Sequence, residues 1–366
     1  MTDTIDISSS AGSYNFTVGR SIFEKHLTAL KKKNQFSDCF IFADENVWKN
    51  HNNRIQTAFE SAGLSFKKEI IPSGEKSKSI KQWERLTGVL LQSGVRRNTP
   101  LFAIGGGVTG DLSGFVASAT MRGIPLIHVP TTLLAMVDSS IGGKTGVNHE
   151  TGKNLVGAFY QPVEVIADTT FLDTLPDREW NNGLSEILKY GAIRDRSIFD
   201  RSEFFLERSS ASNKKENSSL ENLILDCAGI KADIVQEDEF ESGKRAYLNF
   251  GHTFAHAMEK VADYGTLSHG EAVYLGMLAA TNLSNSLGAD LNDEILRKFR
   301  PLYSFDISPE MLPVDSMFKT MKLDKKNVDE NFRFVLLKNW QQPVVETVNN
   351  EELIRKAWLT VFNELD

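Results

Sequence analysis

The sequence is poor in cysteine and has no long apolar run. Only Cys39 and Cys227 occur among 366 residues, each inside an apolar segment and without CxxC spacing. A disulfide framework and a zinc ribbon are therefore excluded, and both residues are predicted to be core thiols. The chain also lacks a run of about 18 apolar residues that could span a bilayer, and residues 1–16 lack the basic and apolar regions of a secretion signal. We expect a cytoplasmic protein that does not bind membranes.

An excess of positive charge is absent as well. The 41 Lys and Arg residues are outnumbered by 48 Asp and Glu residues, which gives a formal net charge of −7. General binding of nucleic acid is therefore not expected, although local clusters of Lys and Arg can still bind an anion. Hydrophobic residues at 41% and charged residues at 24% are typical of a packed globular protein. A length of 366 residues favours two domains.

Short apolar runs alternate with helix-like segments in the first half of the chain. The runs lie at residues 39–43, 70–71, 101–104, 126–129 and 163–166. Between the second and third runs, Ile80, Trp83, Leu86 and Leu90 recur at helical spacing, which supplies the crossover that parallel strands require. This pattern predicts an α/β domain with a mostly parallel sheet.

After Pro176 almost every periodic segment is helical, apart from an apolar run at residues 334–337. Residues 209–219, rich in Ser, Asn and Lys, are typical of a solvated loop between helices. We therefore predict an α/β domain over residues 1–176 and an all-α domain over residues 177–366.

A glycine turn follows the third predicted strand. Gly105, Gly106 and Gly107 lead into a segment of small residues that is typical of a helix. Such a turn brings backbone N–H groups close to an anion, typically a dinucleotide pyrophosphate. It is not the GxGxxG fingerprint, so glycines that only make a tight turn are an alternative. Asp44, directly after the first strand, fits ribose hydroxyls but also fits a helix N-cap.

The segment from Pro130 to Asn154 combines hydroxyls and glycines with two lysines, Lys144 and Lys153, which are predicted to lie in glycine-rich turns. An ammonium is a point charge that can bind an anion from many directions. We interpret the segment as an anion site, with a solvated loop as the alternative.

Polar residues form a stripe in the second half. Arg245, Asn249, His252 and His256 are spaced by four, three and four residues, so they share one face if the segment is a single helix. The other positions are apolar, as in a buried helix. Burying such a stripe is costly unless it lines a wet cavity or binds a metal. Lys231 is a similar case, because it falls on the apolar side of its helix, where an anionic ligand would balance its charge.

Histidines and a carboxylate make a zinc site plausible. The candidates are His252, His256, His269 and a carboxylate such as Glu186, and catalytic zinc commonly takes three N or O ligands from the protein and leaves one position open. Spacing does not choose which three, although His252 and His256 are the obvious local pair. Glu186 and Lys189, one helical turn apart, also fit an ordinary surface ion pair.

Seven segments together resemble 3-dehydroquinate synthases in order and spacing. They are GGGVTGD (105–111), MRG (121–123), VPTTLLAMVDSSIGGKTGVNHETGKNLVGAFYQP (129–162), LSEILKYG (184–191), LNFGHTFAHAME (248–259), LSHGEAV (267–273) and LDKKN (323–327). The resemblance covers most of the chain. It implies an N-terminal Rossmann-like domain, a helical C-terminal domain, a cleft between them and a homodimer.

By similarity, the metal ligands are Glu186, His252 and His269, with zinc or cobalt as the metal. In this set His252 is paired with His269 and not with the neighbouring His256, which the resemblance assigns to the phosphate region of the substrate. The residues that the resemblance assigns to NAD are Asp44, Asn46, Glu75, Lys78, Gly106, Asp111, Thr131, Thr132, Asp138, Lys144, Lys153, Thr174 and Leu175. Those that it assigns to the substrate pocket are Lys144, Asn154, Lys189, Lys231, Arg245, Asn249, His256 and Lys326 or its neighbour Lys325, with Arg122 reaching the pocket from the second subunit.

The resemblance also implies the chemistry, which belongs to the shikimate pathway. The substrate, 3-deoxy-D-arabino-heptulosonate 7-phosphate, carries a carboxylate and a phosphate, so a cage of Lys, Arg and His suits it. NAD oxidises the C5 hydroxyl and the metal polarises neighbouring oxygens. Phosphate leaves by elimination, hydride returns, and an aldol step closes the carbocycle without net redox change.

Other activities are alternatives to this one. Cyclases of sedoheptulose 7-phosphate bind no substrate carboxylate and are expected to depart from Lys231, Arg245 and Asn249, which are intact here. A relative that uses an aminated substrate stays open. A metal-dependent polyol dehydrogenase of the glycerol dehydrogenase type would release NADH and would not need the cationic cage. A non-catalytic paralogue predicts loss of a metal ligand, yet all three are present.

Overall fold

A computed structural model describes residues 2–34, 36–207, 218–241, 243–262, 266–322 and 331–365. The chain forms two compact units, of which the first comprises Met1–Pro176 and Asn217–Phe240 and the second comprises Asp177–Glu216 and Glu241–Asp366. The predicted division at residue 176 differs from these units in one helix, α8 (Ser218–Glu237). Most of the predicted loop at residues 209–219 lies outside the described residues, while Ser218 and Ser219 begin α8.

Helix α8 belongs to the first unit because its apolar side is buried there. It packs against β1 (Thr2–Ser9), β2 (Gly12–Gly19) and a π-helical turn, η3 (Ala135–Ser139). Leu223, Ile224, Cys227, Ala228 and Val235 are all buried on this helix. The prediction that residues 177–366 form one domain is therefore wrong for α8.

The first unit contains a seven-stranded sheet in the order β1-β2-β9-β6-β5-β3-β4. Its five predicted strands are all present, as β3 (Asp38–Asp44), β4 (Ser65–Ile71), β5 (Leu101–Gly105), β6 (Leu126–Pro130) and β9 (Glu164–Asp168). These strands pair in parallel, β2 pairs in parallel with β9, and β1 alone pairs antiparallel, with β2. The mostly parallel α/β sheet is confirmed.

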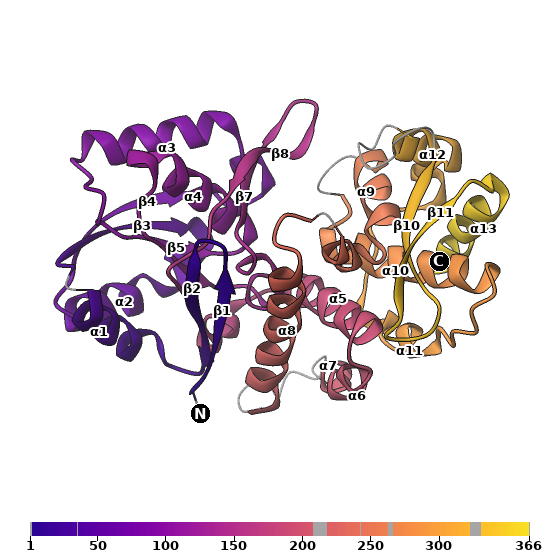
Figure 1. The fold of residues 1–366 in the computed structure, drawn as a ribbon, viewed down its shortest axis with the longest axis horizontal. Coiled ribbons are helices and arrows are strands. Elements are labelled where there is room, and N and C mark those ends of the chain that lie inside the picture. Colours follow the sequence, from indigo (N-terminus) through magenta and orange to yellow (C-terminus); the bar gives the residue numbers. More distant parts are fainter. Residues whose placement is uncertain are drawn as a thin grey trace. The chain divides into compact units, whose positions relative to one another are not determined.

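Helices cover both faces of this sheet, as Figure 1 shows. Helices α1 (Phe23–Asn34) and α2 (Glu45–Ser61) close one apolar core, and α3 (Ile80–Gln92) and α4 (Gly107–Ala119) close the other. Strands β5, β6 and β9 are buried at every position, which explains why apolar residues predominate in them. Because these strands are parallel, their carboxyl ends lie along the same edge of the sheet, where α/β proteins bind ligands.

Two hairpins complete the first unit, namely β1–β2 and the pair β7 (Lys144–His149) and β8 (Gly152–Phe159). Lys144 and Lys153 thus lie on strands, and the prediction that they lie in glycine-rich turns is wrong. The glycines serve strand contact instead, because a Cβ on Gly157 would lie only 2.0 Å from the carbonyl oxygen of Thr145. Close backbone approach is a common reason for glycine within a strand.

The second unit is mainly helical. Its central helix, α10 (His269–Ser286), packs against α5 (Asp177–Ile193), α9 (His252–Val261) and α13 (Glu351–Phe362). The shorter helices are α6 (Ser197–Arg201), α7 (Phe204–Glu207), α11 (Glu294–Arg297) and α12 (Val314–Lys322). One antiparallel hairpin, β10 (Phe332–Leu337) with β11 (Pro343–Val348), means that the unit is not all-α.

The polar stripe of the second unit is not carried by a single helix. Lys244–Asn249 form a 3₁₀ helix, η5, and α9 begins only at His252. Between them Gly251 adopts φ 81°, and a Cβ there would lie 2.8 Å from the backbone nitrogen of Met277 on α10. This close approach interrupts the helix, so the expected common face of Arg245 and His252 does not form.

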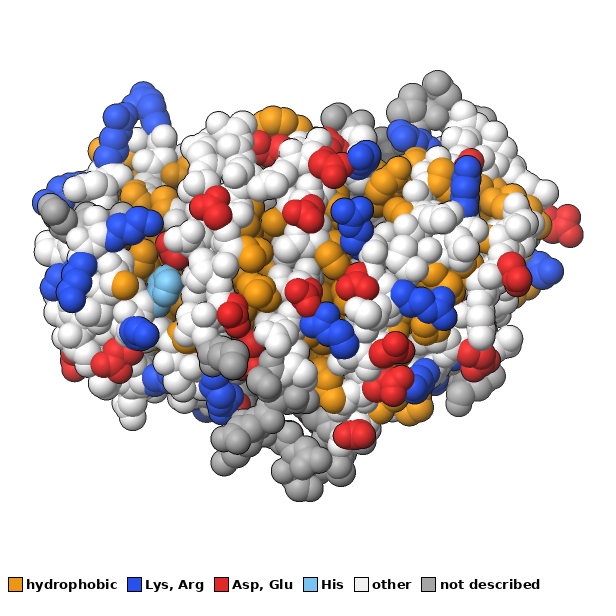
Figure 2. All heavy atoms as spheres, turned by 60° about the horizontal axis from the view of Figure 1, so that its bottom comes forward, with side chains coloured by type: hydrophobic (Ala, Val, Ile, Leu, Met, Phe, Trp, Pro, Cys, Tyr) orange, Lys and Arg blue, Asp and Glu red, His pale blue; other side chains and the backbone are white. Residues whose placement is uncertain are grey.

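The two cysteines, the absence of a membrane-spanning helix among the described residues and the mixed surface charge agree with what the composition indicates. Cys39 and Cys227 are both buried thiols, as predicted. Across the described ranges, no helix is long and apolar enough to cross a membrane. Figure 2 shows both basic and acidic side chains on the face in view, with apolar side chains between them.

Candidate functional site

Three side chains of the second unit form a potential metal site. Glu186 lies on the buried helix α5, His252 is the first residue of α9, and His269 is the first residue of α10. One ligand atom from each lies within 4.8 Å of the others, and among the described residues only these three form such a group. The Oε1 atom of Glu186 is 3.5 Å from Nε2 of His252 and 3.3 Å from Nε2 of His269. A carboxylate and two imidazoles facing one point are a common ligand set for zinc.

The frame of this site is a tight contact between α5 and α10. The Oδ1 atom of Asn182 accepts hydrogen bonds from Ser268 Oγ at 2.7 Å and Gly270 N at 3.1 Å. Ser185 Oγ donates to the carbonyl oxygen of Gly270 at 2.6 Å and lies 2.7 Å from Tyr303 Oη. Since Ser185 precedes Glu186 and Gly270 follows His269, this contact fixes two of the three candidate ligands relative to each other.

The charges around Glu186 perturb the pKa of its carboxyl group. Burial raises the pKa of Glu186, but the Lys189 ammonium and both histidines outweigh it and hold that pKa well below its usual range. Lys189 forms an ion pair with Oε2 of Glu186, and their side chains are only 2% and 1% exposed. The alternative of an ordinary surface ion pair is therefore wrong. Oε2 is engaged with Lys189, while Oε1 faces the histidines.

The pKa values of the two histidines shift in opposite directions. Burial lowers the pKa of His252, and the neighbouring Glu186 only partly opposes this because Lys189 and His269 add positive charge. Burial also disfavours the charged form of His269, but Glu186 and Glu259 raise its pKa to about 10. The difference arises because His269 faces two carboxylates.

Of the other stripe residues, His256 lies in contact with this group. His256 is exposed, and its ring lies 5.6 Å from that of His252 but contributes no atom to the ligand group. The adjacent histidine pair is therefore not the pair that meets Glu186. Arg245 is only 1% exposed, and Asn249 donates to Oε1 of Glu241 at 2.8 Å.

In the first unit, predicted NAD residues lie after the carboxyl ends of the parallel strands. Lys78 donates to Asp111 Oδ2 and Asn154 Oδ1, both at 2.5 Å. Asn148 joins this network by donating to Glu75 Oε1 at 2.7 Å and accepting from the backbone N–H of Asn154 at 2.9 Å. Burial raises the pKa of Asp111, and the charge of Lys78 opposes that shift. Lys78 thus joins Asp111 and Asn154 directly, and Asn148, which was not predicted, links Asn154 to Glu75.

Asp44 caps helix α2, as one of its two interpretations required. Its Oδ1 accepts from the backbone N–H groups of Asn46 at 2.9 Å and Val47 at 3.2 Å. Ser73, which follows β4, donates to the same carboxylate at 2.9 Å. The cap holds Asp44 and Asn46 at the edge of the sheet and leaves the ribose interpretation a prediction.

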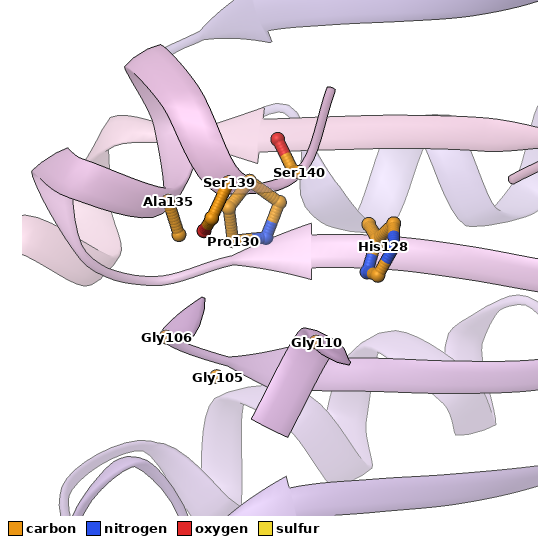
Figure 3. A pocket seen from close by; sticks show the side chains of 8 residues that line it. All are labelled: Gly105, Gly106, Gly110, His128, Pro130, Ala135, Ser139 and Ser140. Atoms are coloured by element: carbon orange, nitrogen blue, oxygen red, sulfur yellow. The ribbon is translucent and has the colours of Figure 1, made fainter. Parts of the chain in front are cut away.

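A small pocket lies at the glycine turn, as Figure 3 shows. Gly105 ends β5 and Gly106 follows it, while Pro130 ends the neighbouring strand β6 and Ala135 and Ser139 follow that strand. A Cβ on Gly106 would lie 3.0 Å from Cγ2 of Thr132, and one on Gly107 3.0 Å from Oγ of Ser139. The glycines therefore let the start of α4 approach the segment after β6, and Thr131 bonds back to Gly105 O through its backbone N–H at 3.0 Å.

Lys231 has an anionic partner within its own unit. Its Nζ donates to the carbonyl oxygen of Asp138 at 2.8 Å and also pairs with the Asp138 carboxylate. The ammonium on the apolar side of α8 is thus balanced by a residue of the π-helical turn η3. Residues predicted for substrate and for NAD are here in direct contact.

The remaining predicted residues are dispersed. Lys144 begins β7 and Lys153 lies on β8, while Thr174 ends the 3₁₀ segment Thr169–Thr174 and Leu175 follows it. Thr174 Oγ1 is 2.7 Å from Nε2 of His51. Arg122 follows the carboxyl end of α4, roughly 20 Å along the helix from Gly106. Lys325 and Lys326 lie outside the described residues.

Several residues with a part in these networks were not predicted from the sequence. Among them are Ser73, Asn148 and Glu259, which contact Asp44, Asn154 and His269 respectively. Glu259 had a detectable signal, since it follows His252 and His256 on one face of α9. Ser73 had none, because its partner Asp44 lies 29 residues earlier, and Asn148 had none, because its contact with Glu75 joins segments 73 residues apart.

Comparison with known proteins gives two adjoining family matches. The pattern of the N-terminal part of 3-dehydroquinate synthases matches residues 68–182, and that of the C-terminal part matches residues 183–327. The 3-dehydroquinate synthase of Salinibacter ruber is 42% identical over 325 residues, which cover 87% of each chain. That of Nitrosospira multiformis is 47% identical over 274 residues, or 74% of each chain.

Solved structures show the same fold. A 2-deoxy-scyllo-inosose synthase complexed with carbaglucose-6-phosphate, NAD+ and Co2+ has a TM-score of 0.83 at 28% identity and covers 99% of both chains. A 2-epi-5-epi-valiolone synthase from Streptomyces hygroscopicus, with NAD+ and Zn2+ bound, has a TM-score of 0.85 at 26% identity and covers 96% of this chain and 97% of its own. A glycerol dehydrogenase from Schizosaccharomyces pombe, 18% identical with a TM-score of 0.64, covers 96% of this chain and 89% of its own and shares the fold alone.

Proposed function

The chain belongs to the 3-dehydroquinate synthase family, and we propose from that premise that it converts 3-deoxy-D-arabino-heptulosonate 7-phosphate to 3-dehydroquinate and phosphate. The observation that carries the proposal is the grouping of Glu186, His252 and His269 within 4.8 Å beside the buried cation of Lys189. This combination suits a hydroxylated, anionic substrate that needs both a Lewis acid and positive charge.

The three ligands fit a divalent metal by their chemistry. Glu186 presents one oxygen to both Nε2 atoms, and the Nδ1 atom of His252 lies 3.2 Å from the carbonyl oxygen of Phe250. Because a carbonyl only accepts, Nδ1 of His252 carries the proton and Nε2 keeps its lone pair for a metal. A bound zinc or cobalt ion would supply a Lewis acid that polarises substrate oxygens.

The first unit fits a dinucleotide. Gly106, Thr131 and Thr132 would contact the pyrophosphate, because the N-terminus of a helix, here α4, favours an anion. Glycine at position 106 keeps this place open, since a side chain there would meet Thr132. Asp44 would accept ribose hydroxyl bonds, and the other proposed contacts are Asn46, Glu75, Lys78, Asp111, Asp138, Lys144, Lys153, Thr174 and Leu175. Bound NAD would supply a hydride acceptor that is regenerated within the same turnover.

The cationic and amide side chains would bind and orient the substrate. Lys231 is held by Asp138, which fixes its ammonium in one place, and Lys189 is held by Glu186. Ammonium and guanidinium groups bind carboxylate and phosphate oxygens. We assign this role to Lys144, Asn154, Lys189, Lys231, Arg245, Asn249, His256 and Lys326 or Lys325, with Arg122 supplied by a second copy in a cytoplasmic homodimer.

Phosphate release by metal-stripped protein tests the proposal. The purified enzyme is dialysed against a chelator and assayed with the heptulosonate phosphate, first without additions and then with zinc, NAD or both. We expect phosphate release only when both are present. Release that needs neither would contradict the proposed chemistry.

A further inference from the structure

The two histidines of the metal site have different partners on their remote nitrogens. Nδ1 of His252 lies 3.2 Å from the carbonyl oxygen of Phe250, which is a neutral dipole. Nδ1 of His269 lies 3.7 Å from Oε2 of Glu259, which is a carboxylate. In both cases Nε2 is the atom turned toward Oε1 of Glu186. Each ring is therefore oriented from behind, but only His269 is oriented by a charged group.

Glu259 lies inside the protein and outside the ligand group. It is 5% exposed on α9, on the same face as His252, which is the first residue of that helix. The ligand group within the described part of the chain does not include it. Its contact is with the far side of the His269 ring, so it acts on the site through His269.

The negative charge of Glu259 also affects the charge balance of the metal site. The carboxylate of Glu186 is already paired with the Lys189 ammonium, and both side chains are buried. A divalent cation bound to Glu186 would therefore add two positive charges next to a buried ion pair that is already neutral. Burying such charge is unfavourable unless an opposite charge is near. The carboxylate of Glu259 supplies one behind His269.

We propose that Glu259 is a positioning residue of the metal site, which holds Nδ1–H of His269 so that Nε2 faces the metal. The inference rests on the proposed metal-dependent function. Outer carboxylates of this kind fix the tautomer and orientation of a ligand histidine, and their loss typically weakens metal affinity by about 10–100-fold.

A matched control is available in Glu271. It is also buried, at 3% exposure, and it lies two residues after His269 on α10. Its carboxylate accepts from the backbone N–H of Ser268 at 2.8 Å and from Arg178 at 2.7 and 2.8 Å. Glu271→Gln therefore disturbs a buried carboxylate and the start of α10 close to His269, but it leaves the contact between Glu259 and Nδ1 of His269 in place.

The experiment is a Co²⁺ titration of the metal-stripped full chain, with competition against a chromophoric chelator. The variants are Glu259→Gln, which keeps an acceptor without charge, Glu259→Leu, which keeps neither, and Glu271→Gln. We expect about 10-fold weaker binding for Glu259→Gln, about 100-fold for Glu259→Leu, and a change within about threefold for Glu271→Gln. Both Glu259 variants should also shift the visible Co²⁺ bands, while the melting temperature of the metal-free protein should not follow the order of affinity.

Three outcomes would overturn the inference. Unchanged affinity and spectra in Glu259→Leu would mean that Glu259 does not orient His269. Equal losses in Glu271→Gln and Glu259→Gln would mean that helix stability alone controls the affinity. A spectrum that indicates a lower coordination number would make Glu259 a direct ligand. Failure of the parent protein to bind Co²⁺ would instead overturn the proposed function, because the variants would then have no affinity to lose.

Discussion

Gly270→Ala is a small perturbation of the frame that holds Glu186 and His269 together. Gly270 follows His269 at the start of α10, where it packs directly on α5. An added Cβ would lie 2.2 Å from Cα of Asn182 and 2.8 Å from its carbonyl oxygen. These are backbone atoms, so the methyl group cannot be accommodated by rotation of a side chain.

The size of the effect follows from these distances. Carbon atoms pack at about 3.5–4.0 Å, so α5 and α10 would have to separate by roughly 1.3–1.8 Å at this point. Metal–ligand distances tolerate changes of only about 0.2 Å. Overpacking of this kind costs about 1–3 kcal/mol. If metal binding must reverse that shift, the dissociation constant rises by about 5- to 150-fold.

The assay is zinc affinity of the metal-stripped protein by competition with a chelator, together with its melting temperature. Gly88→Ala is the matched control, because Gly88 lies on helix α3 and an added Cβ there meets no atom within 4 Å. We expect weaker zinc binding only for Gly270→Ala. A folded Gly270→Ala protein with affinity within twofold of the parent would refute the link between this helix contact and the metal site.

Three further predictions address single side chains. His269→Ala should lose stoichiometric zinc in elemental analysis while His256→Ala retains it, because His256 is outside the ligand group; zinc retained by His269→Ala would contradict the assignment. Lys231→Met should raise the Michaelis constant and lower the free energy of unfolding by up to about 3–5 kcal/mol, since it breaks a largely buried pair with Asp138. Lys231→Arg should change both quantities less. An unchanged Michaelis constant and turnover for Lys231→Met would remove Lys231 from the substrate site. Burial lowers the pKa of His128 from 6.5 to about 4, so the folded state favours its neutral form. The corresponding stability, about 3 kcal/mol, is complete above pH 6.5 and is lost as the pH falls toward 4; His128→Gln should flatten this part of the pH dependence of unfolding, and an unaltered slope would contradict it.

Much of the sheet could be predicted from local sequence because its strands are buried on both faces. Mainly apolar runs such as residues 101–104 and 126–129 identify such strands without knowledge of their neighbours. The hairpin β7–β8 was missed for the opposite reason. Its glycines look like turn residues, but Gly157 serves a backbone contact with Thr145 that only the paired strands create.

The site shows the same limit. Spacing brought out the histidines, but it favoured His252 and His256 as a pair, and the residue that joins His252 is His269, from the start of another helix. The choice came from family resemblance. Helix α8 was assigned to the wrong domain because its amphipathic pattern is compatible with packing on either unit, and only the buried contact with β1, β2 and η3 decides.

The most direct test of the central claim compares two substrates. Phosphate release is measured from 3-deoxy-D-arabino-heptulosonate 7-phosphate and, separately, from sedoheptulose 7-phosphate, with NAD and zinc present and NADH followed by its absorbance. We predict phosphate from the first substrate alone, with no accumulation of NADH. Release from the second substrate would assign the chain to a different cyclase activity, and steady NADH from a simple polyol without phosphate release would contradict the account altogether.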